Sequence, residues 1–145
     1  GGKGNEGVAA NVTRTKGSLG YVEYAYAKKN NIPVLALQNK DGKYVMPDDL
    51  TFAAAAANAN WSSVPGMGIS LVSQPGADAY PVVTASFILM YKDPANKGES
   101  AEVLKFFDWA FKNGKALAAD LDYVPLPDKL TNEIRQNVWS QVKTK

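Results

Sequence analysis

An α/β fold with a mixed sheet is predicted by this sequence, because candidate strands and candidate helices alternate along the chain. Two segments carry most of this prediction. Tyr80–Tyr91 reads as the longest strand, and its apolar run at residues 87–90 implies burial on both faces. The stretch from Ser100 to Asn113-Gly114 reads as the clearest helix, because Val103, Phe106, Phe107, Ala110 and Phe111 form one apolar stripe at helical spacing.

The first part of the chain is predicted to alternate in the same way. Glycine and asparagine mark the ends of its helices, whereas aromatic and β-branched residues mark its strands. In order, we expect a helix ending before Gly17 with Asn5 as its N-cap, a strand over Leu19–Tyr24, a helix over Tyr24–Asn30, a strand over Ile32–Gln38, a hairpin turn over residues 39–42 and a return strand over residues 43–46.

The remaining elements follow from caps, alanines and apolar spacing. Pro47-Asp48-Asp49 predicts a helix start, since acidic residues suit the positive end of a helix, and the alanine run at 53–57 continues that helix. Residues 58–79 are rich in Gly, Pro, Ser and Asn and read as a loop with a short strand near Ile69–Val72. After the long helix we expect a short helix over Ala116–Asp120 and a last helix that contains Leu130, Ile134 and Val138.

The composition of the chain excludes several classes of function. Its 145 residues carry a formal net charge of +2, which is too balanced for a dedicated nucleic-acid surface. Cysteine and histidine are both absent, so disulfides, thiolate sites and a Ser-His-Asp triad are excluded within this chain. The longest apolar run is far shorter than the ~20 residues that a membrane helix needs.

Three groups of residues have both a functional and a structural interpretation. Residues 1–4, Gly-Gly-Lys-Gly, resemble a phosphate cradle only weakly, and a flexible entry to a helix explains them as well. The carboxylate pairs Asp48/Asp49 and Asp120/Asp122 are acid–base or cation-binding candidates, but a helix start and a polar turn explain them without chemistry. Tyr21, Tyr24 and Tyr26 are candidates for a stacking platform, although strand alternation places Tyr21 and Tyr24 on opposite faces and favours packing in the core or at a cleft edge.

Three blocks of sequence resemble one known family. They are Gly17-Ser-Leu-Gly-Tyr-Val-Glu-Tyr-Ala-Tyr-Ala27, Tyr80-Pro-Val-Val-Thr-Ala-Ser-Phe-Ile-Leu89 and Glu102-Val-Leu-Lys-Phe-Phe-Asp-Trp-Ala-Phe-Lys112. In wording, order and spacing they resemble the phosphate-binding proteins of bacterial Pst-type ABC transporters. The resemblance runs from Gly1 to about Val142 and corresponds to the C-terminal half of that family.

This resemblance implies the C-terminal half of a two-lobed, type II periplasmic-binding-protein fold with mixed sheets. Residues 1–81 would complete lobe II, and residues 82–145 would complete lobe I after the chain returns through a hinge. The hinge or interlobe residues would be Tyr80, Pro81, Val82, Val83 and Thr84. The family's oxyanion ligands lie in the other half, and neither Arg14 nor Arg135 is followed by the expected Ser-Gly-Thr. We therefore expect no catalytic residue, no primary phosphate ligand, no metal site and no cofactor in this segment.

The implied function is that of the phosphate-binding component of an ABC importer, which holds inorganic phosphate between two lobes and delivers it to the membrane permease. The resemblance also implies an extracytoplasmic, periplasmic location after removal of a signal peptide. A binder of another oxyanion, such as sulfate or molybdate, and a secreted phosphate-binding or phosphatase-like protein stay open as alternatives. We expect the segment to be a fragment that either joins its missing N-terminal half or associates with itself.

Overall fold

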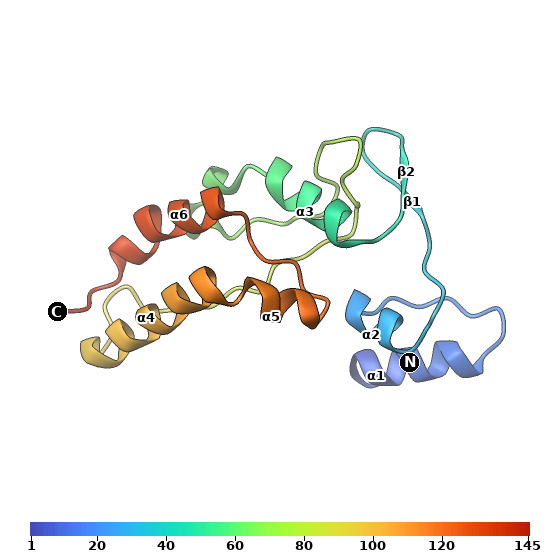
Figure 1. Cartoon of the computed structure of the whole chain (residues 1–145), viewed down its shortest axis with the longest axis horizontal. Coiled ribbons are helices and arrows are strands. Elements are labelled where there is room, and N and C mark those ends of the chain that lie inside the picture. Colours follow the sequence, from blue (N-terminus) through green and yellow to red (C-terminus); the bar gives the residue numbers. More distant parts are fainter.

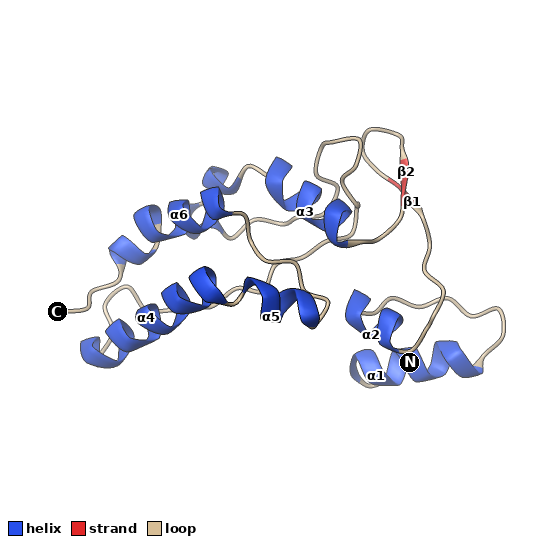
Figure 2. Ribbon diagram, in the orientation of Figure 1, coloured by secondary structure: helices blue, strands red, loops and turns tan.

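Helices dominate the computed structural model, which describes all 145 residues. Figure 1 shows an elongated molecule in which α4 and α5 form one layer, α3 and α6 form another, and α1 and α2 gather at one end. The single sheet has two strands, as Figure 2 shows. The predicted combination of helices and β-structure is present, but the chain is rich in helix and the predicted mixed sheet is reduced to one antiparallel hairpin.

The element bounds are α1 Gly4–Arg14, α2 Tyr24–Lys29, β1 Leu37–Gln38, β2 Tyr44–Val45, α3 Asp49–Asn58, the 3-10 helices η1 Trp61–Ser63 and η2 Pro65–Met67, α4 Lys97–Asn113, α5 Lys115–Asp120, α6 Asp128–Asn137 and the 3-10 helix η3 Trp139–Gln141.

α1 and α2 lie side by side, and the loop that joins them packs closely on α1 (Figure 1). A Cβ atom at Gly20 would come within 2.7 Å of Val12 and 3.0 Å of Val8, so the lack of a side chain there allows the approach. Asn5 is not the predicted N-cap. It lies inside α1, and its Oδ1 accepts a hydrogen bond from the N–H of Glu23 at 2.9 Å, which ties the two helices together.

The β1–β2 hairpin is antiparallel, with Leu37 opposite Val45. The predicted turn over residues 39–42 is confirmed, and Gly42 adopts a φ of 77°, which costs glycine no Cβ clash. The predicted strand Ile32–Gln38 is wrong over residues 32–36. No other segment pairs with those residues, so only Leu37–Gln38 has ladder hydrogen bonds.

Asp48 caps α3, as the acidic start of this helix predicts. Its carboxylate accepts a hydrogen bond from the Thr51 N–H at 2.8 Å, and the Thr51 hydroxyl accepts one from the Asp48 N–H at 3.0 Å. This reciprocal capping box satisfies backbone donors that the helix itself leaves free. The alanines that follow allow α3 to pack closely, and Ala55 and Ala56 are buried.

A small apolar core lies between the middle of the chain and α6. Its buried members are Ala56, Ala59, Trp61, Met67, Leu71 and Leu130. The indole Nε1 of Trp61 donates a hydrogen bond to the Ala56 carbonyl at 2.8 Å, so the ring fills the core with its polar atom satisfied. Leu130 is the contribution of α6, and this cluster therefore holds the last helix against the middle of the chain.

α4 ends at the predicted place but begins at Lys97, three residues before the predicted start at Ser100. Asn96 caps it by accepting a hydrogen bond from the Glu99 N–H at 3.1 Å. Its apolar stripe, however, is only partly covered: Phe106 of the stripe is 60% exposed, the flanking Trp109 is 53% exposed, and no residue of α4 is buried. No helix of the structure has both the length and the apolar character that crossing a membrane requires.

Three further predicted strands, Leu19–Tyr24, Ile69–Val72 and Tyr80–Tyr91, do not form as strands. Residues 82–91 exchange no backbone hydrogen bond with any other residue, and Leu89 and Tyr91 are exposed, so their predicted burial on both faces is wrong here. A strand is stabilised when a neighbouring strand pairs with its N–H and C=O groups. Within these 145 residues no neighbour pairs with these segments.

Candidate functional site

The expected hinge segment begins at Tyr80, which is firmly attached to the first part of the chain. The Tyr80 N–H donates to the Thr51 carbonyl at 3.1 Å, and its hydroxyl donates to the Leu35 carbonyl at 3.4 Å. The ring meets Phe52 edge-on at 5.5 Å between centroids. Burial raises the pKa of the Tyr80 hydroxyl, so it stays a neutral hydrogen-bond donor at physiological pH.

The attachment ends one residue later. Pro81 is buried, and its carbonyl accepts a hydrogen bond from the Ser73 N–H at 2.9 Å. Val82 is 60% exposed and begins the stretch that makes no backbone hydrogen bond. Val83 is half-buried against the apolar core, and the Thr84 hydroxyl reaches only the adjacent Ala85 carbonyl at 3.5 Å. The five residues thus divide into a fixed entry, Tyr80–Pro81, and a loosely held continuation.

Asn39 is a buried polar residue that the sequence reasoning placed only in a turn. It is 7% exposed, and its side-chain amide donates to the carbonyls of Gly76, Ala77 and Ala79 at 3.1, 2.8 and 3.2 Å. The signal in the sequence is an asparagine at the first position of an Asn-x-Asp-Gly turn, where its side chain is expected to bond to nearby backbone. That signal does not reveal the second loop that the amide binds.

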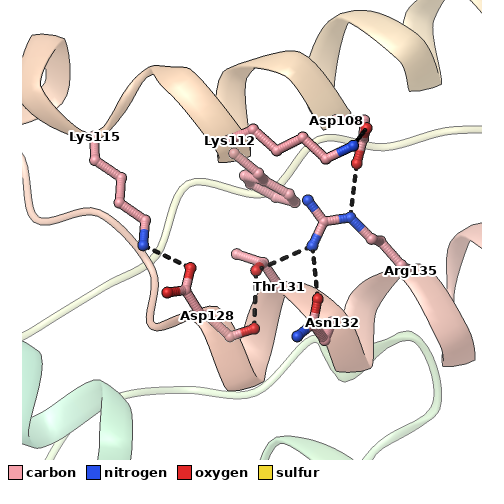
Figure 3. Close-up of a pocket in the computed structure, with 8 residues that line it drawn as sticks. Asp108, Lys112, Lys115, Asp128, Thr131, Asn132 and Arg135 are labelled. Carbon is pink, nitrogen blue, oxygen red and sulfur yellow. Dashed lines mark hydrogen bonds and ion pairs between the residues drawn. The ribbon is translucent and has the colours of Figure 1, made fainter.

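A charged groove of about 540 Å³ lies between α4 and α6, close to α5 (Figure 3). Asp108 accepts hydrogen bonds from Lys112 at 2.5 Å and from the Nε of Arg135 at 2.7 Å. Lys115 pairs with Asp128 at 2.5 Å across the same groove. All three cations that line the groove are therefore paired with carboxylates of the chain itself.

Arg135 has further partners that fix its plane. A second guanidinium nitrogen donates to the Thr131 hydroxyl at 3.2 Å and to the Asn132 side-chain oxygen at 3.0 Å (Figure 3). The guanidinium carbon also lies 5.7 Å from the Phe111 ring centroid and 5.8 Å from that of Trp139. This arrangement fastens α6 to α4 and leaves few Arg135 donors for an added anion.

The hydrogen bonds from Lys112 and Arg135 hold the pKa of Asp108 below its ordinary value. Asp108 therefore stays ionised at neutral pH and is not suited to be a proton donor or acceptor there. The groove is best described as an ion-paired helix contact and not as a catalytic site.

A second groove, of about 680 Å³, separates α1 and α2 from the loop that follows α5. The Tyr26 hydroxyl donates to Glu6 at 3.1 Å, and the hydrogen bond to that carboxylate raises the pKa of Tyr26. A hydrogen bond to Glu23 likewise raises the pKa of Tyr123. The Tyr26 hydroxyl is thus committed to a carboxylate of α1, whereas Tyr123, from the loop that follows α5, faces Glu23 at the start of α2 across the groove.

The other candidate residues do not come together. Asp48 serves as a helix cap, and Asp122 is ion-paired with Lys28, whose pKa its carboxylate raises. Among the residues described, no group of three or more His, Cys, Asp or Glu side chains is placed to hold a metal ion. The Gly-rich residues 1–4 lead directly into α1.

The three neighbouring tyrosines lie in separate surroundings. Tyr24 meets Phe52 edge-on at 5.3 Å, Tyr26 binds Glu6, and Tyr21 is 92% exposed. The prediction that they do not share one surface is confirmed. The prediction that they pack in the core or at a cleft edge is wrong for Tyr21. Strand alternation is not the reason, because residues 19–23 do not form a strand.

Comparison with known proteins agrees with the family resemblance. The chain is 51% identical over 144 residues to "Phosphate-binding protein PstS" of Pasteurella multocida, a match that covers 99% of this chain and 42% of the relative. It is 46% identical over 143 residues to the protein of the same name from Haemophilus influenzae, covering 43% of that relative. A third relative of this name, from Methanocaldococcus jannaschii, is 33% identical over 154 residues, and 39% of it is covered. No protein-family model matches the chain.

The chain thus spans about two-fifths of the length of these relatives and matches them almost from end to end. Identities of this size over the whole chain establish homology to a segment of the proteins named PstS.

Proposed function

We propose that this chain, as a homologue of a segment of the PstS phosphate-binding proteins, contributes scaffold and hinge to a two-lobed protein that binds inorganic phosphate. The single observation that carries the proposal is 51% identity to such a protein over 99% of the chain. The whole protein would serve an ABC importer outside the cytoplasm and hand phosphate to the membrane permease. It is a binding protein in this proposal and not an enzyme.

The ion pairs of this segment favour a structural role for it over a role in binding the anion. A buried oxyanion is recognised by preorganised N–H, hydroxyl and guanidinium donors that the site holds free for it. Here Arg135 is bound to Asp108 and stacked beside two aromatic rings, and Arg14 donates to the Ala10 carbonyl of its own helix. We therefore propose that the primary phosphate ligands come from the part of the relatives that this chain does not match.

The hinge is proposed to lie in Tyr80–Thr84, with residues 1–81 in one lobe and residues 82–145 in the other. The change at Pro81 supports this division, because anchoring hydrogen bonds stop there and residues 82–91 have none. Contacts across residue 81 oppose it: Leu130 of the second part packs in the same apolar cluster as Trp61 and Met67 of the first part. Lys28 of the first part is also ion-paired with Asp122 of the second. The proposal therefore requires the full-length protein to replace these shared contacts with contacts made within each lobe.

Titration calorimetry of the full-length protein with phosphate and with sulfate tests the function. We expect tight phosphate binding and weak sulfate binding. Absence of phosphate binding, or a preference for sulfate, would contradict the proposal and would favour another oxyanion. A phosphatase assay on the same material covers the enzymatic alternative.

Alanine substitution of the polar residues between 1 and 84, again in the full-length protein, tests the role of this segment. If the ligands lie elsewhere, single substitutions change phosphate affinity modestly. A loss of about a thousandfold at one position, equal to about 4 kcal/mol, would identify a primary ligand here and refute the assignment.

A further inference from the structure

The side chain of Asn39 lies between two loops that are distant in sequence, and it contacts both. Its amide nitrogen donates to three carbonyls in the loop over residues 76–79, which runs directly into Tyr80. Few side-chain groups bind so many backbone atoms at once, since an amide has only two N–H bonds to share. At least one of its two N–H groups is therefore shared between two carbonyls, and the single amide group binds most of the loop.

The oxygen of the same side chain holds the other loop. Asn39 Oδ1 accepts hydrogen bonds from the Asp41 N–H at 3.1 Å and the Lys43 N–H at 2.9 Å, which closes the hairpin turn on itself. The Asp41 carboxylate then reaches across and accepts a hydrogen bond from the Gly76 N–H at 3.2 Å. The turn and the loop are thus joined in both directions.

Gly76 shows that the loop is closely fitted at this point. Its φ is +120°, a conformation that side chains with a Cβ rarely adopt. An added Cβ atom would also come within 2.2 Å of the Asn58 side-chain nitrogen, at the end of α3. At the end of the loop, Ala79 is fully buried, and its N–H donates to the Gly76 carbonyl at 3.0 Å.

We propose that Asn39 is a positioning residue that fixes the stationary end of the hinge. This inference rests on the proposed function, because it assumes that the chain bends within the hinge segment Tyr80–Thr84 when the lobes close on phosphate. The clamp made by Asn39 holds residues 76–79, and Tyr80 and Pro81 are bonded to the same body through Thr51 and Ser73. Bending then begins at Val82, the first residue without a backbone partner.

Loss of the clamp is expected to weaken binding through entropy. A freed loop moves in the open form, where few contacts restrain it, and is ordered when the lobes close. Closure then costs additional conformational entropy, and the dissociation constant for phosphate rises. Freedom equivalent to the lower end of the range for one backbone residue corresponds to a rise of about fivefold to tenfold.

Asn39→Asp in the full-length protein tests this inference. The carboxylate keeps the two acceptor bonds of the turn but loses the donor bonds and faces three carbonyl oxygens. We expect the phosphate dissociation constant to rise about fivefold to tenfold, and amide hydrogen exchange to increase at residues 73–81 while the turn at 39–43 stays protected. Asn39→Ala removes both halves of the clamp, so exchange should then increase in the turn as well.

Asn113→Asp is the matched control. It makes the same chemical change to an amide that donates to a backbone carbonyl, that of Trp109 at 3.0 Å, but at the end of α4. It should leave the dissociation constant within twofold of the unmodified protein. If Asn39 has a purely structural role, Asn39→Asp lowers the melting temperature only. Amide hydrogen exchange at residues 73–81 then changes no more than in other loops, and the affinity for phosphate at 25 °C is unchanged.

The outcomes separate the two proposals. If the unmodified protein does not bind phosphate, the proposed function fails and this inference fails with it. If it binds phosphate and Asn39→Asp binds within twofold as tightly, the hinge-positioning role alone is overturned.

Discussion

Replacing Phe106 by serine should destabilise the full-length protein, whereas in this chain alone it should reduce self-association. In this chain 60% of Phe106 is exposed on α4, beside Trp109, which is 53% exposed. A phenylalanine buries roughly 150–250 Å² when it is fully covered, so about 120 Å² stays available to a further surface. At about 25 cal/mol per Å², covering that area contributes about 3 kcal/mol.

We expect the part of the relatives that this chain does not match to cover Phe106. Phe106→Ser should therefore lower the free energy of unfolding of the full-length protein by about 3–5 kcal/mol, the usual cost of truncating a core phenylalanine. In this chain alone the same change removes an exposed apolar group, so it should reduce self-association. Denaturant unfolding of the full-length protein and light scattering of the chain measure the two effects.

Lys105→Ser is the matched control, since it places the same residue at the neighbouring position of α4. Lys105 is exposed and pairs only with Glu102 on the helix surface, so its loss should cost less than about 0.5 kcal/mol. If Phe106→Ser in the full-length protein costs no more than Lys105→Ser, the stripe is not covered and the reasoning is refuted. A cooperatively unfolding 15.6 kDa monomer of this chain would contradict it as well.

Three other predictions concern the core, a helix cap and an ion pair. In the full-length protein, the unfolding costs of Met67→Ala and Leu130→Ala should add within about 0.5 kcal/mol if the two lobes separate them; a larger coupling in chemical denaturation would show that they stay in contact and would contradict the division at residue 81. Asp48→Ala should destabilise the protein by about 1 kcal/mol, and Asp48→Asn, which still caps, should restore most of that loss in the same melts. The lowered pKa of Asp108 means that its ion pairs stabilise the fold above the ordinary value of about 3.8 and lose this effect as the pH falls through the lower, folded value. Stability measured against pH should thus be less steep below pH 4 in Asp108→Asn, and an unchanged slope would show that this carboxylate does not contribute.

Local chemistry predicted the helices and the hairpin well. The capping box at Asp48, the Asn-x-Asp-Gly turn and the apolar spacing of α4 each depend on residues close in sequence. Such signals act over a few residues, so a sequence reveals them without knowledge of the rest of the fold. The start of α1 is the exception, because Asn5 binds Glu23, the residue before α2, and does not cap its own helix.

Strands and polar contacts between remote segments were harder to predict, since both depend on partners that are distant in sequence. Tyr80–Tyr91 has the composition of a buried strand, but pairing requires a neighbour that these residues do not provide. Asn39 was recognised as a turn residue, whereas its contacts with residues 76–79 arise only when two remote loops meet. For the same reason the pairing of Arg135 with Asp108 is not visible in the sequence.

The places where the strand predictions fail are also places where large apolar side chains are exposed. Leu19 and Tyr21 lie in one such segment, and Ile88, Leu89 and Tyr91 lie in another. In a folded protein, local propensity, apolar pattern and packing normally agree with one another. These residues have the composition of strands, lack a pairing strand and expose apolar side chains, and this combination indicates a missing neighbour. Unpaired edges and apolar side chains are what a second part of the protein would cover. Because the chain matches about two-fifths of each relative, the remaining three-fifths is the neighbour that we expect to pair with these segments.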